Sequence, residues 1–308
     1  MAETILQKTT KLSNGVEMPV FGLGVWKSSN QQAADSVRAA VKHGYRLIDT
    51  AKQYGNEAGV GYGIQQALVE NHLNRKDLFI TTKIFNGDQG YVSTLENFKE
   101  QLKRLRLTYV DLLLIHWPVD GKYLDTWKAL EKLYHDGKVR AIGVSNFDEA
   151  NLADIERLDG LMPQVNQMEF NPLIQEKHLL TKMNGLGVAM EAWSPLGGGE
   201  ALSDPTVQAI ADKHGKTAAQ VILRFDYQMG VITIPKSSHE ERIVANSQID
   251  DFELSDEEMK QIQAMDKEKR SIWHGDFAWH KGSEETGTKD SVSYWDDNDE
   301  YLNKEVTY

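Results

Sequence analysis

Short apolar segments rich in β-branched residues alternate along the chain with stretches whose apolar positions recur every three to four residues. Most of the apolar segments lack a polar residue at every second position, which is typical of strands buried on both faces of a parallel sheet. The predicted strands are 18–25, 45–50, 78–84, 110–117, 139–145, 164–170, 187–194 and 230–235. The predicted helices are 31–43, 57–70, 92–106, 123–135, 149–157, 175–183, 205–214 and 217–227.

This strand-then-helix rhythm predicts an α/β protein, a closed (β/α)8 TIM barrel that forms a single domain over residues 1–270. The rival fold is an open doubly wound sheet with a dinucleotide-binding glycine fingerprint. Gly22 and Gly24 start such a fingerprint, but Lys27 occupies the third glycine position, so the fingerprint fails. The Asn14-Gly15 pair ahead of the first strand predicts a β-hairpin, which we expect to plug the bottom of the barrel.

Composition narrows the class of partner. The chain of 308 residues has 46 acidic and 34 basic side chains, a net charge of −12, which argues against nucleic acid or an anionic membrane as a partner. It has no cysteine, which excludes disulfides, thiolate catalysis and cysteine-ligated metals. The histidines show no metal-ligand spacing, and we expect no metal. Without a signal-like start or a membrane-length apolar run, a cytoplasmic protein is expected.

The last residues form a distinct segment. Residues 276–308 carry nine acidic side chains and three lysines, which is half of the net charge, and three of the seven tryptophans lie after residue 272. A disordered acidic tail is usually poor in aromatic residues. We therefore predict an acidic, tryptophan-containing C-terminal tail over 271–308, of which at least 271–282 packs on the barrel. It would lie either beside the substrate pocket or on an outer helix.

Polar residues end three successive predicted strands. Asp49, Lys83 and His116 stand at the ends of the second, third and fourth strands, and Tyr54 follows in a loop. Each could be structural by itself, as an ion pair, a loop tyrosine or a core histidine. Their joint position favours chemistry, because the active sites of such barrels lie at the carboxyl ends of the strands.

These four residue types suit the reduction of a carbonyl group. A lysine beside a tyrosine is expected to lower the phenol pKa from its reference of ~10. Asp49 would keep Lys83 charged, Tyr54 would protonate the developing alkoxide, and His116 would orient the carbonyl. The electrons must come from a hydride donor.

Later strands carry residues suited to such a donor. Ser145 and Asn146 close the fifth strand and Gln167 lies on the sixth, and all three offer partners for a carboxamide. Trp193, at the end of the seventh, can stack on a planar ring.

An anion site is predicted after the eighth strand. Lys236 and Ser237 follow it and Arg242 lies about one helical turn further on, where barrels commonly bind phosphate. The alternative is a pair of solvated cations on a surface helix.

Seven motifs carry a resemblance to a known family. They are GYRLIDTA (44–51), YGNE (54–57), VDLLLIHWP (110–118), GVSNF (143–147), QVNQ (164–167), WSPL (193–196) and IPKS (234–237). Over residues 5–270 the chain resembles the aldo-keto reductase superfamily, in particular bacterial members that act on 2,5-diketogluconate and glyoxals.

The resemblance implies a role for each matching residue. Asp49, Tyr54, Lys83 and His116 match the catalytic tetrad, with Tyr54 as the proton donor. The positions that match cofactor contacts are Ser145, Asn146, Gln167, Trp193, Ser194, Leu196, Lys236, Ser237, Arg242 and Asn246, and they imply NADPH as the cofactor.

The chain departs from the family pattern at three positions. Trp193 stands where a tyrosine usually stacks, Ala245 where a glutamate is common, and Phe85 where a tryptophan is common.

The substrate is expected to be a small carbonyl compound in an aromatic and largely uncharged pocket. The expected lining is Trp26, Tyr54, Phe85, His116 and Trp117. Two other functions remain open: a Schiff-base barrel aldolase that uses Lys83, and a cofactor-sensing binding protein with vestigial reductase activity. A monomer or a weak homo-oligomer is expected.

Overall fold

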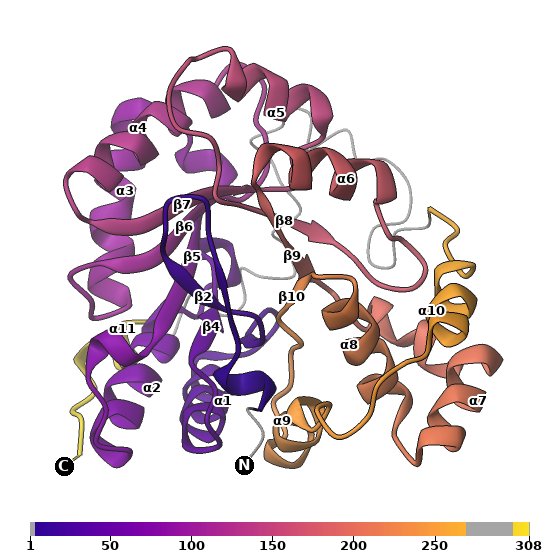
Figure 1. Cartoon of the computed structure of the whole chain (residues 1–308). Helices are drawn as coiled ribbons and strands as arrows, with labels where there is room; N and C mark the ends of the chain where they lie inside the picture. Colours follow the sequence, from indigo (N-terminus) through magenta and orange to yellow (C-terminus); the bar gives the residue numbers. More distant parts are fainter. Residues whose placement is uncertain (1–3, 269–297, 308) are drawn as a thin grey trace.

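The computed structural model describes residues 4–268 and 298–307 (Figure 1). Eight parallel strands form one sheet in the order β10-β9-β8-β7-β6-β5-β4-β3. They are β3 (Gly22–Gly24), β4 (Leu47–Asp49), β5 (Phe79–Ile84), β6 (Val110–Ile115), β7 (Val139–Ser145), β8 (Val165–Glu169), β9 (Ala189–Trp193) and β10 (Ile232–Thr233). Parallel bridges from Phe21 to Thr233 and from Gly24 to Lys236 join the two edges. The predicted (β/α)8 barrel is confirmed.

Helices surround the strands on the outside, as Figure 1 shows. They are α1 (Asn30–Lys42), α2 (Glu57–Glu70), α3 (Tyr91–Arg104), α4 (Tyr123–His135), α5 (Glu149–Glu156), α6 (Lys177–Leu186), α7 (Pro205–His214), α8 (Ala218–Gln228), α9 (Glu240–Ser247) and α10 (Asp256–Gln263). In the described part of the chain, no helix has the length and apolar character needed to cross a membrane.

The predicted hairpin is also confirmed. Strands β1 (Thr9–Lys11) and β2 (Glu17–Pro19) pair antiparallel, and Leu12 and Met18 pack against apolar side chains inside the barrel. Figure 1 shows the hairpin crossing the face of the barrel. The single strand predicted over 18–25 was wrong: it divides between β2 and β3, because pairing with β1 ends at Pro19 before the barrel begins.

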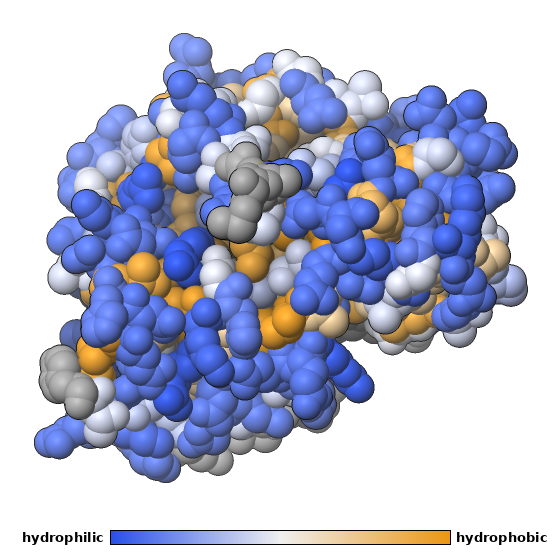
Figure 2. All heavy atoms as spheres, turned by 60° about the horizontal axis from the view of Figure 1, so that its bottom comes forward, coloured by the Kyte–Doolittle hydropathy of each residue, from blue (hydrophilic) through white to orange (hydrophobic). Residues whose placement is uncertain are grey.

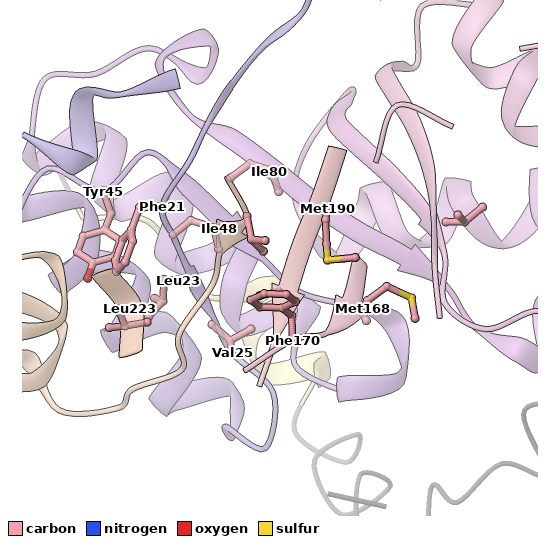
Figure 3. Packing of buried hydrophobic residues seen from close by; sticks show 14 of the residues in the cluster. Phe21, Leu23, Val25, Tyr45, Ile48, Ile80, Met168, Phe170, Met190 and Leu223 are labelled. Carbon is pink, nitrogen blue, oxygen red and sulfur yellow. The ribbon is translucent and has the colours of Figure 1, made fainter. Parts of the chain in front are cut away.

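Two apolar layers hold the barrel together. One fills its interior, and the larger lies between the strands and the helices, where side chains such as Met168, Phe170 and Met190 gather (Figure 3). The rings of Phe21 and Tyr45 lie 5.7 Å apart in the same layer. Hydrophilic side chains dominate the face in Figure 2, and hydrophobic groups show between them. This packing holds the strand ends, and therefore the residues on them, in fixed positions.

Three helices toward the C-terminus were not among the predicted helices, and α9 is the first of them. Helix α10 begins with a capping box in which Ser255 and Glu258 bond reciprocally, and the serine-to-glutamate spacing is the signal that could have found it. Helix α11 (Asn298–Asn303) packs on α2, and Tyr301 is buried there beside Ala58. The residues 271–282, for which packing on the barrel was predicted, lie outside the described ranges.

Glu258 links α10 to α7. Its carboxylate accepts hydrogen bonds from Lys213 Nζ (2.7 Å), His214 Nε2 (3.0 Å) and the Ser255 amide (2.8 Å). Burial raises the pKa of Glu258, but these hydrogen bonds outweigh burial and lower the pKa to about 2. An acid with a lowered folded-state pKa stabilises the fold above its unfolded-state pKa and loses that contribution as the pH falls toward 2.

The variant Glu258→Gln should therefore lower the free energy of unfolding by about 2 kcal/mol at pH 7, since hydrogen bonds to a charged group are lost. The difference from the unaltered protein should shrink between pH 4.5 and pH 2. Urea unfolding at pH 7 and pH 3 measures it, with the exposed neighbour Glu257→Gln as control. Equal unfolding energies for the two variants at pH 7 would contradict the assignment.

Candidate active site

Four side chains meet at the carboxyl ends of β4, β5 and β6. Lys83 Nζ lies 2.7 and 2.8 Å from the two carboxylate oxygens of Asp49 and 3.2 Å from the hydroxyl of Tyr54. It also donates to the carbonyl of Thr50 at 3.0 Å. The rings of Tyr54 and His116 lie edge to face, 5.8 Å apart. The structure thus brings together the four residues that the sequence singled out.

The loop after β4 places Tyr54. Tyr54 ends a short 3-10 helix, Lys52–Tyr54, and Gly55 then takes a φ of 67°, a left-handed conformation that glycine adopts without strain. The residue after Gly55, Asn56, is itself held in place, because its side-chain Nδ2 donates to the main-chain carbonyls of Val25 and Ser28 at 2.9 Å. The YGN sequence therefore returns the chain sharply to α2 while the phenol ring stays at the end of the barrel.

Burial and neighbouring side chains set the protonation states of Lys83 and Tyr54. Burial lowers the pKa of Lys83, but the charge of Asp49 and the hydrogen bonds to Asp49 and Tyr54 outweigh burial and keep the lysine protonated. The pKa of Tyr54 rises to about 12, because burial raises it more than Lys83 lowers it. The expectation that Lys83 would bring the phenol pKa below its reference value was wrong in its net direction. Tyr54 is fully protonated at neutral pH.

His116 is neutral. Burial, together with the positive charge of Lys83, holds its pKa well below the ordinary value. Its Nδ1 atom is buried and has no hydrogen-bond partner among the described residues. Nε2 is therefore the ring nitrogen available to a bound molecule.

A cavity of about 560 Å³ opens above these residues at the carboxyl ends of the strands. Its wall includes most of the residues expected from the sequence. They are Trp26, Asp49, Tyr54, His116, Trp117, Ser145, Asn146, Gln167, Trp193, Ser194, Leu196, Lys236 and Arg242. Four other residues of the wall were not among those predicted for the site, namely Gly24, Lys27, Gln53 and Leu202. The rest of the wall consists of Pro195, Ile234 and Pro235, which lie within the motifs WSPL and IPKS, and of Gly198 and Gly199, which closely follow WSPL.

These four residues lie within eight positions of a predicted strand end, so extending each motif by a few positions could have found them. Lys27 is the most informative, because its ammonium lies 4.5 Å from the centre of the Trp26 ring. The aromatic end of the cavity thus contains one cation, Lys27, which was not among the predicted lining residues.

Four of the expected residues stand apart from the cavity wall, as far as the described residues define it. Lys83 lies beneath it, fully buried. Phe85 follows β5 and is half-buried, next to Gly87. The hydroxyl of Ser237 bonds to the backbone of His239 at the start of α9. Asn246 is buried on α9.

Trp193 is held by Asn146. The indole Nε1 donates to Asn146 Oδ1 at 2.9 Å, while Asn146 Nδ2 donates to the His116 carbonyl and to Ser145 Oγ at 3.0 Å. All of the amide's hydrogen-bonding atoms are thus engaged within the protein. The indole ring of Trp193 therefore has a fixed position, and Asn146 acts as its support.

Gln167 contributes one free acceptor. Its Nε2 donates to Asp49 at 2.9 Å and to Glu191 at 2.7 Å, and the Ser145 hydroxyl donates to its main-chain carbonyl at 2.9 Å. Oε1 accepts no hydrogen bond from a described residue. It is the amide atom that Gln167 offers to the cavity.

Two cations stand at the far end of the cavity. Lys236 follows β10 and Arg242 lies on α9, and both are exposed. Neither forms an ion pair with a described side chain. Together with the turn at Ser237 they form a positively charged corner next to the start of α9.

Enzymes built on this barrel have their active sites at the carboxyl ends of the strands. In this chain that end of the barrel has a cavity above a buried lysine–carboxylate pair and a tyrosine. A family model described as the aldo/keto reductase family matches residues 18–267. The chain therefore belongs to the aldo/keto reductase family, whose members are oxidoreductases.

Individual relatives agree with this assignment. The chain is 54% identical over 268 residues to the glyoxal reductase of Bacillus subtilis, covering 87% of this chain and 96% of the relative. It is 47% identical over 263 residues to the 9,11-endoperoxide prostaglandin H2 reductase of Trypanosoma cruzi, covering 84% and 92%. The solved aldo-keto reductase of Bombyx mori in complex with NADP has a TM-score of 0.85 and 32% identity, covering 90% and 98%.

We expect the Lys83–Asp49 ion pair to contribute strongly to the free energy of unfolding. Replacing Lys83 by methionine leaves Asp49 as an uncompensated charge in a dry site, which should lower the free energy of unfolding by about 3–5 kcal/mol. Urea unfolding at pH 7 measures the loss. The double variant Asp49→Asn, Lys83→Met removes both charges and should recover part of it. A double variant less stable than Lys83→Met would show that the loss in Lys83→Met does not come from the unpaired charge of Asp49.

Proposed function

We propose that the protein is an NADPH-dependent oxidoreductase that reduces aldehydes and ketones to alcohols, with Tyr54 as the proton donor. The observation that carries the proposal is the position of the Tyr54 hydroxyl, 3.2 Å from the Lys83 ammonium and at the floor of the cavity. A protonated phenol beside a neutral imidazole is the arrangement that a carbonyl oxygen needs as it gains negative charge.

The residues of the cavity fit NADPH. The carboxamide of a nicotinamide has an NH2 group, and Gln167 Oε1 is a free acceptor in the wall. The fixed indole of Trp193 offers a flat apolar surface for the ring, and Lys236 and Arg242 offer charges for phosphate groups. When bound, NADPH supplies the hydride.

The protein's own groups then handle the proton. Tyr54 and His116 Nε2 would both reach the oxygen of a carbonyl bound above them. As the carbonyl carbon gains the hydride, the phenol O–H bond of Tyr54 breaks and its proton passes to the oxygen, giving the alcohol. The phenolate left on Tyr54 is stabilised by the ammonium of Lys83, which Asp49 holds in place.

The substrate side of the cavity is lined by Trp26 and Trp117 with Lys27 at its edge. This lining suits apolar or weakly polar carbonyls, and Lys27 adds a place for a negative or electron-rich group. The name of the relative at 54% identity makes glyoxals the first compounds to test. The prostaglandin reductase at 47% identity shows that larger substrates occur among similar proteins.

The geometry favours reduction over a Schiff-base aldolase. An aldolase needs an unprotonated lysine that reaches the substrate. Lys83 is fully buried beneath the cavity wall, and its ammonium contacts Asp49, Thr50 and Tyr54. A cofactor-sensing binding protein would keep the same cavity, so only turnover separates it from the reductase.

The decisive variant is Tyr54→Phe. It removes the proton donor and leaves the cofactor end of the cavity intact, so the rate of carbonyl reduction should fall by a factor on the order of 10² or more. NADPH affinity, followed by quenching of tryptophan fluorescence, should change less than about threefold. Glyoxal, methylglyoxal and an aromatic aldehyde serve as substrates, with NADPH absorbance as the readout.

The control variant is Tyr91→Phe, which removes an exposed hydroxyl on α3 and should leave the rate unchanged. A variant at Phe147 would not serve as a control, because Phe147 is buried in the core. Turnover of Tyr54→Phe near that of the unaltered protein would overturn the mechanism. Tight NADPH binding without turnover of any carbonyl would favour the binding-protein function instead.

The positively charged corner should set the choice between NADPH and NADH. NADPH carries one more phosphate group than NADH, and this group suits Lys236 and Arg242. The variant Arg242→Met should raise the Kd of NADPH about tenfold or more and that of NADH less than about twofold. Fluorescence titration with both nucleotides measures this, and Arg157→Met, directly after α5, is the control. An equal weakening of both nucleotides would contradict the proposal.

A further inference from the structure

A second carboxyl group lies inside the barrel beside the catalytic residues. Glu191 is on β9, two residues before Trp193, and its side chain is completely buried. Its Oε2 accepts the hydrogen bond from Gln167 Nε2 at 2.7 Å. Its Oε1 is buried and has no hydrogen-bond partner among the described residues. The reduction mechanism above does not use this carboxyl group.

Glu191 and Asp49 together fix the orientation of Gln167. A primary amide has two N–H bonds, and Gln167 Nε2 directs them to Asp49 Oδ2 at 2.9 Å and to Glu191 Oε2. The reversed amide would place its oxygen against the Asp49 carboxylate, which is unfavourable. Gln167 is therefore held with Oε1 free, as an acceptor for the NH2 of a carboxamide.

Glu191 lies close enough to Asp49 and Lys83 for their charges to act on it. Burial, together with the charge of Asp49, raises the pKa of Glu191 to about 8, although Gln167 and Lys83 act in the opposite direction. Tyr54 also faces this charge, because ionised Glu191 raises the pKa of Tyr54. The paired position on β10 is the apolar Ile232.

We propose that Glu191 is a positioning residue that fixes Gln167 for the nicotinamide carboxamide, and that its charge state sets the preference between oxidised and reduced nicotinamide. The inference rests on the proposed function, since it concerns the cofactor of that reaction. An oxidised nicotinamide ring is cationic and a reduced ring is neutral. A buried anion beneath the ring therefore favours the oxidised form.

The direction with pH follows from the proton on Glu191. Near pH 7 the carboxyl is mostly neutral, and the ring site carries the balanced pair of Lys83 and Asp49. As the pH rises through about 8, Glu191 becomes an anion. The ratio of the Kd of NADP⁺ to the Kd of NADPH should then fall. Phosphate contacts at Lys236 and Arg242 affect both forms equally and cancel in the ratio.

Two variants separate the two roles. Glu191→Leu removes the acceptor and should raise the Kd of NADPH about five- to tenfold, the value of one hydrogen bond to a fixed polar group. Glu191→Gln keeps an acceptor for Gln167 and should restore most of this affinity, but it cannot ionise. The Kd ratio should fall on the order of tenfold between pH 7 and pH 9.5 in the unaltered protein and stay flat in Glu191→Gln. Tryptophan fluorescence with each nucleotide measures all four quantities.

A matched control exists on α8. Asp226 is also fully buried, neither of its carboxylate oxygens has a partner among the described residues, and burial raises its pKa well above the ordinary value. It lies outside the wall of the cavity. Asp226→Asn should therefore leave the Kd ratio and its pH dependence unchanged.

A measurement without cofactor completes the test. A buried acid with a raised pKa stabilises the fold below its unfolded-state pKa of about 4.5 and loses that contribution as the pH rises through about 8. The free energy of unfolding should therefore fall less steeply between pH 5 and pH 9 in Glu191→Gln than in the unaltered protein.

The outcomes distinguish the inference from the proposed function. If the unaltered protein and Glu191→Gln show the same pH dependence of the Kd ratio, or if Glu191→Leu binds NADPH as tightly as the unaltered protein, the role of Glu191 is overturned. If no nicotinamide nucleotide binds to the unaltered protein, the proposed function itself fails. In that case the pH dependence of unfolding still tests the charge state of Glu191.

Discussion

The buried ammonium of Lys83 is the constraint on which the site depends. A fully buried charge is unfavourable unless it is paired and hydrogen-bonded, and here its partners come from β4 and from the loop that follows. The strand register that sets β4 beside β5, and the turn that brings Tyr54 back over the strand end, are therefore both required by one lysine. The geometry proposed for catalysis and the stability of the site therefore have the same physical origin.

The outer face of β5 is fixed as well. Gln101 on α3 donates to the Lys83 carbonyl at 3.0 Å and to the buried carboxylate of Glu57 at 3.0 Å. Glu57 also accepts from Thr82 at 2.7 Å and from Arg104 at 2.8 Å. These bonds tie α2, α3 and β5 into one unit behind the lysine. The position of the ammonium is thus set from the helices as well as from the barrel interior.

The sequence predicted the barrel because its signals are local. Strand and helix periodicity, and polar residues at strand ends such as Asp49 and His116, depend only on neighbouring positions. The net rise in the pKa of Tyr54 could not be predicted, because it results from two opposing effects whose sizes depend on burial. The engagement of Asn146 with Trp193 was missed for a related reason, since it joins the ends of two strands that are far apart in the sequence.

The same reasoning explains why Glu191 escapes a search by motifs. On β9 the alternate positions 189, 191 and 193 share one face of the strand. The strand pattern therefore places Glu191 on the same face as Trp193, but it does not predict which residues of other strands Glu191 contacts. Only closure of the barrel brings that face toward Asp49 and Lys83 from the opposite part of the chain. A barrel interior adds the charges of residues that are distant in sequence, and with two carboxyl groups around one ammonium it favours a proton on one of them. The chemistry of such a site is therefore a property of the closed sheet as well as of the four residues at its rim.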